Sequence, residues 1–256
     1  MNSLSCSHSV MSDPPQNLLL AALPAETLAR WLPYLECIDL PAGKVLCESS
    51  CRTTYAYFPT TAVISLLCIT EEGGTSEVAV VGDDGVVGVS MIMGGTTMLN
   101  RAVVQSSGLG FRLPSLLVTA EMERAGPSLQ LMLRYTQSLI TQVMQIAACN
   151  RHHTIAQQLA RRLLTALDTS PNGEVAMTQE GVASLLGVRR EGVTTAALKL
   201  QRAGVIRYQR GHIFVLDRDS LETHTCECYA ALTKEHKRLL PMLVSTRRLA
   251  PMAIAA

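Results

Sequence analysis

Features that would assign this chain to a membrane or secreted class are missing. The longest stretch without a charged residue in the body of the chain, Thr53 to Thr70, contains Pro59 and six Thr or Ser residues. A membrane-spanning helix needs about 20 mostly apolar residues, so we expect none and no membrane partner. The first basic residue is Arg30, which is too late for the charged start of a secretory signal. The sequence therefore predicts a cytoplasmic protein.

Enzyme motifs are missing as well. The sequence contains no G-x-S-x-G nucleophile elbow, no P-loop and no H-E-x-x-H zinc motif, and no carboxylate pair is convincingly placed in a cleft. The eight cysteines include no C-x-x-C pair, and most should be reduced thiols in a long chain without a signal. We therefore predict a protein that is not an enzyme, with no catalytic residue, no metal and no other cofactor.

The charge of the chain is unevenly distributed. The 256 residues are 48% hydrophobic, which is enough for one or two domains with their own cores. Residues 1–150 contain 7 Lys or Arg and 12 Asp or Glu, a net charge of −5, whereas residues 151–256 contain 15 and 9, a net charge of +6. Unless the division is due to chance, it indicates two domains, of which the basic one faces a polyanion.

The first half has the pattern of an all-β barrel or roll. After two short helical segments, Leu18–Ala22 and Ala25–Leu32, apolar runs rich in Val, Ile, Leu and Thr alternate with turn signals such as Glu72-Gly73-Gly74. We predict an α+β chain in which residues 15–126 form a β-roll sensor or effector domain. The predicted strands are Val45–Cys47, Ala62–Ile69, Val78–Val81, Ala102–Gln105 and Gly110–Leu113.

Residues 127–151 have the period of one long helix. Apolar residues recur every three or four positions, and Arg134 is the only charged residue between Arg124 and Arg151. A helix that is apolar over so broad a face must bury it against its own domain and a second surface. We predict a dimerisation helix, with a core helix of one chain as the alternative. The predicted seam, closed by a polar residue that sets the register, is Met132, Thr136, Leu139, Val143, Ile146 and Asn150.

Residues 154–218 are predicted to form a winged helix-turn-helix. Thr178 is a favourable N-cap, Gly187 suits a tight turn between two helices, and Val205–Arg207 and His212–Leu216 would pair as a wing. The preceding residues 152–153 are interpreted as a hinge between domains. Residues 219–244 are expected to be a C-terminal helical extension that docks against this hinge.

The second helix of this motif carries the chemistry of DNA recognition. A recognition helix enters the major groove N-terminus first, where Arg190 can bind guanine and Glu191 can accept from cytosine. Basic residues farther along would contact phosphates. A winged helix that binds protein is the alternative. The predicted DNA-contacting residues are Thr178, Arg189, Arg190, Glu191, Thr194, Thr195, Lys199, Arg202, Arg207 and Arg210.

The order of β-roll, long helix, hinge and winged helix resembles the Crp/Fnr bacterial transcription regulators over roughly residues 18–218. The most specific stretch, Gly187–Val193, is similar to the family's G-x-S-R-E-T-V opening of the recognition helix. Gly192 stands where Thr is usual and Thr195 where a second Arg is usual, so we expect an unusual operator. The resemblance implies a homodimeric, sequence-specific regulator of transcription. Its partners would be a near-palindromic double-stranded DNA operator and RNA polymerase.

The family's cyclic-nucleotide sites have a cassette resembling F-G-E-[LIV]…R-[ST]-A, in which the glutamate binds ribose and the arginine binds the cyclic phosphate. Gly88 and Arg101 match this cassette, but Val89 and Ala102 replace the glutamate and the hydroxyl residue. We therefore expect these four residues to contact an effector other than cyclic AMP. Arg101 would bind another anion or serve as a structural arginine.

The cysteines do not match the family's iron–sulfur branch, because only Cys6 lies in the N-terminal tail. Cys149 with His152–His153, and Cys226 with Cys228, offer thiolate and imidazole ligands for zinc. Their spacings match no standard site, and on a helix Cys226 and Cys228 would point to different faces. We expect packing thiols, with a metal- or thiol-based redox sensor in the same scaffold as the alternative.

Overall fold

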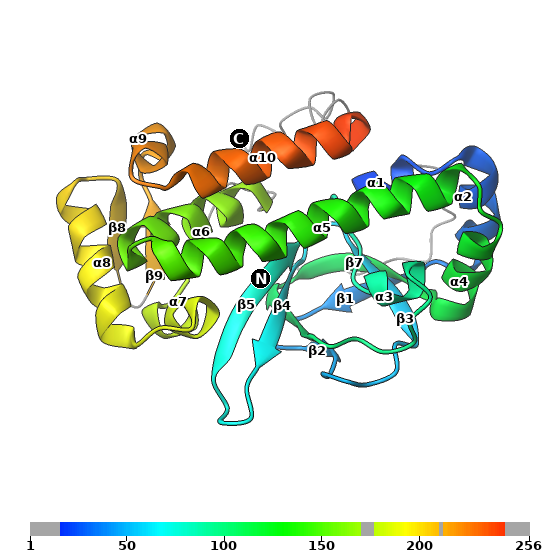
Figure 1. The fold of residues 1–256 in the computed structure, drawn as a ribbon, viewed down its shortest axis with the longest axis horizontal. Coiled ribbons are helices and arrows are strands. Elements are labelled where there is room, and N and C mark those ends of the chain that lie inside the picture. Colours follow the sequence, from blue (N-terminus) through cyan, green and yellow to red (C-terminus); the bar gives the residue numbers. More distant parts are fainter. Residues whose placement is uncertain (1–15, 170–176, 210–211, 244–256) are drawn as a thin grey trace.

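The structure is a computed structural model that describes residues 16–169, 177–209 and 212–243 (Figure 1). It has the predicted α+β architecture, in which a β-roll, a long helix and a winged helix-turn-helix follow one another. Cys6 of the N-terminal tail, Arg210 and the last residue of the predicted extension lie outside the described residues. In the part of the chain that is described, no helix is both long and apolar enough to cross a bilayer.

The β-roll consists of two antiparallel sheets that enclose apolar side chains. One sheet has the order β1-β7-β3 and the other β2-β6-β4-β5. The helices α1 (Leu18–Ala21) and α2 (Ala25–Trp31) and the 3-10 helix η1 (Leu32–Tyr34) precede them, and Trp31 packs beside Phe58 in the core. The strands are β1 (Glu36–Leu40), β2 (Val45–Cys47), β3 (Tyr55–Pro59), β4 (Val63–Ile69), β5 (Thr75–Val81), β6 (Arg101–Ser106) and β7 (Gly108–Pro114).

Each of the five predicted strands is present within a few residues of its expected bounds. Two further strands, β1 and β3, were not predicted, since β1 contains two acidic residues and β3 ends in a proline. The predicted β-roll region 15–126 also contains two helices that were not predicted, α3 (Val89–Ile92) between β5 and β6 and α4 (Ser115–Glu123) after β7. The apolar residues of α4 are not confined to one helical face, so the sequence does not show the three- and four-residue spacing that indicates a helix.

Helix α5 (Pro127–His152) is the long helix, and it runs from the β-roll to the helix-turn-helix (Figure 1). One face packs on the roll, where Tyr135 Oη donates to the carbonyl of Val86 (3.1 Å) and Gln142 accepts from the Val80 amide (3.0 Å). A second face is covered by α10. The remaining face is exposed and apolar. Its large side chains are Leu133, Ile140, Val143 and Met144.

The chain bends at the predicted hinge. Helix α5 ends at His152, His153 is extended, and the next helix begins at Ile155. The elements that follow are α6 (Ile155–Thr169), α7 (Gln179–Leu186), α8 (Arg190–Arg202), β8 (Ile206–Gln209) and β9 (His212–Val215).

The C-terminal extension is two helices rather than the single helix expected. Helix α9 (Arg218–Thr223) is separated from α10 (Glu227–Leu239), and Cys226 occupies the N-cap position of α10. Helix α10 lies along α5 (Figure 1). The Cys228 thiol lies 3.4 Å from His153 Nδ1. The prediction that the extension docks against the hinge is therefore confirmed.

Candidate functional site

The helix-turn-helix consists of α7 and α8. The Thr178 hydroxyl accepts from the amide of Gly181 (3.0 Å), so it caps α7 as predicted. Gly187 adopts φ +67°, which lets the chain turn sharply before α8 begins at Arg190. Val193 and Leu200 of α8 are buried in the core of this domain. Their burial fixes which face of α8 remains exposed.

The exposed face of α8 carries the predicted base-reading pair at its first turn. Arg190 and Glu191 are both exposed, and Arg190 Nε lies 3.8 Å from Glu180 Oε2 of α7. Such a solvent-exposed pair is weak, so it does not hold the Arg190 side chain on α7. Thr194 is only half exposed, because its hydroxyl donates to Gln179 Oε1 (2.9 Å) and fixes α8 on α7.

The predicted phosphate-contacting residues surround this face. Lys199 and Arg202 are exposed in the second half of α8, and Arg207 is exposed on β8. The Arg207 guanidinium lies 5.5 Å from the ring centroid of Phe214 on the neighbouring strand, which orients it on the wing. The remaining predicted contacts, Arg189 and Thr195, are also exposed. Arg210 lies outside the described residues.

The structure places the four predicted effector residues in different surroundings. Gly88 adopts φ +117° as the N-cap of α3, and Val89 is half-buried in that helix. Arg101 Nε lies 3.1 Å from Glu48 Oε2, while Ala102 is completely buried among the side chains of the roll. Because both side chains of this pair are partly exposed, at 34% and 54%, the pair does not decide between the two interpretations of Arg101.

A buried ion pair joins the β-roll to the helix-turn-helix domain. Arg162 of α6 and Glu77 of β5 approach to 2.6 Å, and their side chains are 1% and 4% exposed. Ser65 donates to the same carboxylate (2.6 Å), and Gln105 accepts from the guanidinium. We did not predict this pair from sequence. The available signal was Glu77, the one acidic residue within the apolar run of β5.

The predicted dimer seam is mostly buried within the chain and has to be corrected. Met132, Thr136, Leu139 and Ile146 are at most 9% exposed, and Met132 and Leu139 belong to the apolar clusters of the β-roll. Asn150 is half-buried near the hinge, where its carbonyl accepts from Gln158 (3.5 Å). Of the six residues, only Val143 lies on the exposed apolar face.

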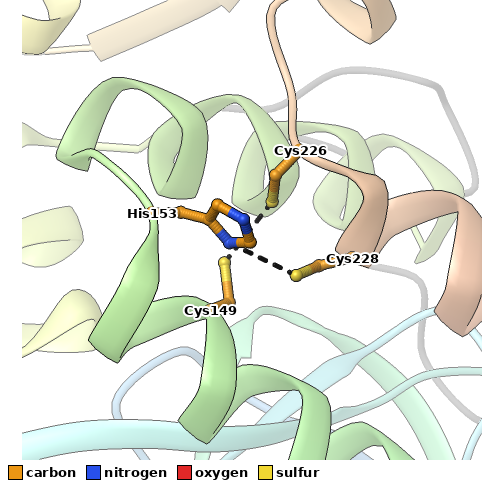
Figure 2. A group of neighbouring side chains, drawn as sticks. All are labelled: Cys149, His153, Cys226 and Cys228. Atoms are coloured by element: carbon orange, nitrogen blue, oxygen red, sulfur yellow. Dashed lines mark hydrogen bonds between the residues drawn. The ribbon is translucent and has the colours of Figure 1, made fainter.

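Three cysteines and a histidine from distant segments meet at the hinge (Figure 2). Cys149 lies in the last turn of α5, His153 follows that helix, and Cys226 and Cys228 begin α10. One ligand atom from each of the four residues lies within 4.8 Å of the others. The Sγ atoms of Cys149 and Cys226 are 3.6 Å apart. We call this group the hinge cluster.

The hinge cluster contradicts the expectation that Cys226 and Cys228 face apart. Because Cys226 is the N-cap of α10 rather than part of its helical repeat, both thiols turn towards the cluster and are buried. Cys149 and His153 are four residues apart, which puts them on one side of the helix end. His152, the other predicted ligand, is exposed and does not belong to the cluster.

Burial is the largest influence on the pKa of two of these thiols, Cys149 and Cys228. It raises the pKa of Cys149 to about 12, although the neighbouring Arg161 acts in the opposite direction. Burial also raises the pKa of Cys228. Cys47, Cys51 and Cys68 also have free thiols, whereas Cys37 is disulfide-bonded.

Comparisons with known proteins agree with the predicted resemblance. Residues 157–224 match the model of the Crp-like helix-turn-helix domain. No curated protein matches the chain. Among solved structures, a putative Crp/Fnr regulator from Eubacterium rectale has a TM-score of 0.65 at 18% identity, with 78% of this chain and 94% of that chain covered.

Two further solved structures share the fold. A Crp/Fnr-family transcriptional regulator from Thermus thermophilus has a TM-score of 0.59 at 21% identity, with 76% of this chain and 98% of that chain covered. The c-di-GMP-responsive regulator CLP from Xanthomonas campestris has a TM-score of 0.60 at 14% identity, with 76% and 100% covered. The resemblance predicted from sequence is therefore confirmed for the fold and for the helix-turn-helix domain.

Proposed function

We propose that this chain, which combines a Crp-like helix-turn-helix domain with the fold of the Crp/Fnr regulators, is a cytoplasmic, homodimeric transcription regulator that binds a near-palindromic operator. The observation that carries the proposal is the exposed Arg190–Glu191 pair at the first turn of α8. It lies at the end of the helix that enters the major groove in such motifs. Lys199, Arg202 and Arg207 supply the positive charge that a phosphate backbone requires. RNA polymerase would be contacted by the operator-bound dimer.

Substitution of Arg190 tests the assignment of base recognition. Because a guanidinium can bind guanine O6 and N7 together, Arg190→Ala should cost about 1–3 kcal/mol of binding free energy and relax preference at one base pair per half-site. Binding is measured on the sequence selected by the native protein and on single-base-pair variants of it, across a salt series.

Lys199→Ala is the matched control on the same helix. As a phosphate contact it should weaken binding to all sequences alike and flatten the salt dependence. If Arg190→Ala instead lowered affinity equally for every sequence, Arg190 would be a backbone contact and the assignment would be wrong.

The exposed apolar face of α5 supports dimerisation. Leu133, Ile140 and Met144 are 47%, 48% and 61% exposed, and their spacing of seven and four residues follows one face of a coiled coil. A contiguous apolar stripe of this kind is typical of an interaction surface. A second copy of α5 packed on this stripe would place two recognition helices about a two-fold axis, as a palindromic operator requires.

We propose that the β-roll transmits a signal other than cyclic AMP. Arg101 is paired with Glu48, and the buried Ala102 and half-buried Val89 offer no polar group for ribose or phosphate. Cyclic AMP should therefore show no saturable binding at micromolar concentration and should leave DNA affinity unchanged. Isothermal titration calorimetry checks this prediction. A dissociation constant in the low micromolar range, coupled to tighter DNA binding, would contradict it.

A further inference from the structure

The ligand atoms of the hinge cluster are arranged at the separations of a tetrahedral metal site. With metal–sulfur bonds of about 2.3 Å, two sulfurs on a tetrahedral zinc ion lie about 3.8 Å apart. The Cys149 and Cys226 sulfurs are 3.6 Å apart, and Cys228 Sγ is 3.4 Å from His153 Nδ1. Small movements of side chains would therefore suffice to enclose an ion.

The surroundings of the cluster match the charge of metal-bound thiolates. Arg161 of α6 is 3% exposed, and its Nε donates to Cys149 Sγ (3.3 Å). Among the described residues no carboxylate forms an ion pair with Arg161, so a cysteine sulfur is the acceptor that faces this buried cation. Gln145 Nε2 donates to Cys228 Sγ (3.1 Å). Three thiolates and a divalent ion carry a net charge of −1, which a guanidinium balances.

The histidine is oriented as a ligand. Its Nδ1 faces the sulfurs, while its Nε2 lies 3.2 Å from Glu227 Oε1. Metal-binding histidines commonly donate their second ring nitrogen to a carboxylate, which fixes the tautomer and leaves the first nitrogen free to coordinate. Glu227 therefore positions His153 for coordination through Nδ1.

We propose that the hinge cluster binds one Zn²⁺ per chain through Cys149, His153, Cys226 and Cys228. Soft thiolate ligands with one imidazole favour zinc, and four protein ligands leave no open coordination position. The site is structural rather than catalytic. It fastens the C-terminal extension to the end of α5 and to the hinge from which the DNA-binding domain continues.

Zinc also preorganises the dimer for its operator, a consequence that rests on the proposed DNA-binding function. A palindromic site must be met by two recognition helices at once, so a loose hinge adds an ordering cost to binding. A filled hinge cluster removes that cost. Removal of zinc should therefore weaken binding to the full operator by about fivefold or more, and binding to an isolated half-site much less.

Metal content tests the site independently of DNA. The full chain, expressed with zinc in the medium and purified without chelator, should contain about one zinc per chain by inductively coupled plasma mass spectrometry. After chelation, Co²⁺ should bind in its place with the absorption spectrum of a tetrahedral, thiolate-rich site. Absence of both signals, an iron–sulfur chromophore, or a Cys149–Cys226 disulfide in the purified protein would overturn the proposal.

Two matched pairs of variants locate the ligands. Cys228→Ser and His153→Gln should lose zinc or release it to a weak chelator, whereas Cys68→Ser and His152→Gln, at exposed positions outside the cluster, should retain it. Should Cys228→Ser fail to fold, the Co²⁺ spectrum of the native chain still decides the ligand class. Equal zinc retention by both members of a pair would contradict the assignment.

The DNA measurement separates this inference from the proposed function. Zinc-loaded protein that binds no DNA would disprove the proposed function and leave the metal site standing. Metal-free protein that binds full operator and half-site as tightly as the zinc-loaded form would disprove the preorganising role. Re-addition of Zn²⁺ to chelated protein should restore operator affinity, and Mg²⁺, which prefers oxygen ligands, should not.

Discussion

Glu77→Ala is expected to lower the free energy of unfolding by about 3–5 kcal/mol, because it leaves the buried guanidinium of Arg162 without its carboxylate. Gln105 and its amide oxygen cannot replace the lost charge. Denaturant unfolding of the native and variant chains measures the difference. The same change should loosen the DNA-binding domain from the β-roll, since the pair joins β5 to α6.

Two further variants test whether the loss of stability in Glu77→Ala arises from breaking the Glu77–Arg162 ion pair. Glu72→Ala, an exposed change in the preceding turn, should alter stability by less than about 0.5 kcal/mol. The double variant Glu77→Leu with Arg162→Met removes both charges and should recover most of the loss, because no unpaired charge stays buried. The single variants Glu77→Leu and Arg162→Met are measured alongside. If the loss of stability in the double variant equals the sum of the losses in these two single variants, the two residues act separately.

Ile140→Arg is expected to convert the proposed dimer into a monomer and to weaken operator binding by about 100-fold or more. The substitution places a charge, repeated by symmetry, on the exposed apolar face of α5. A monomer engages one half-site and loses the gain from simultaneous binding of two, which is typically 10²–10⁴-fold. Analytical ultracentrifugation and DNA binding measure the two effects.

Leu116→Arg is the control for this substitution. Leu116 is a 76% exposed apolar residue on α4, a different helix from the one that carries the proposed dimer face. It should leave both mass and affinity unchanged. An unchanged dimer in Ile140→Arg would show that the exposed face of α5 is not the main interface.

The winged helix-turn-helix could be predicted from sequence because its signals are local. Thr178 caps the start of α7 and the left-handed Gly187 ends it, so both ends of this short helix are set by residues directly beside it. The alternation of inward Val193 and Leu200 with outward Arg190 then follows from helical periodicity. No distant part of the chain was needed to place these side chains.

Most residues of the predicted dimer seam lie one position before the residues that are exposed on α5, and this offset has a physical reason. Helix α5 is apolar around most of its circumference because it contacts both the β-roll and α10, so periodicity alone could not show which stripe stays free. Leu139 and Ile140 are neighbours in sequence, yet only Leu139 is buried. The position of the roll decides between them.

The hinge cluster and the Glu77–Arg162 pair could not be predicted from local sequence pattern. Cys228 and His153 are 75 positions apart in the chain, and Arg162 and Glu77 are 85 positions apart. The spacing of Cys149 and His153, on one side of a helix end, was a usable signal. Cys226 and Cys228 can face the same site because α10 begins between them, and the sequence did not predict this helix start. Long-range contacts of this kind depend on how helices pack rather than on local pattern.

Selection of bound sequences from a random pool of double-stranded DNA is the most direct measurement of sequence-specific binding by this chain. The native chain, acting as the proposed dimer, should enrich inverted repeats whose half-site centres lie about 10–10.5 base pairs, or a multiple of that, apart. Arg190→Ala should enrich the same repeats with one base pair per half-site left unspecified. A pool that shows no enriched sequence, with retention that depends only on salt, would contradict a sequence-specific regulator.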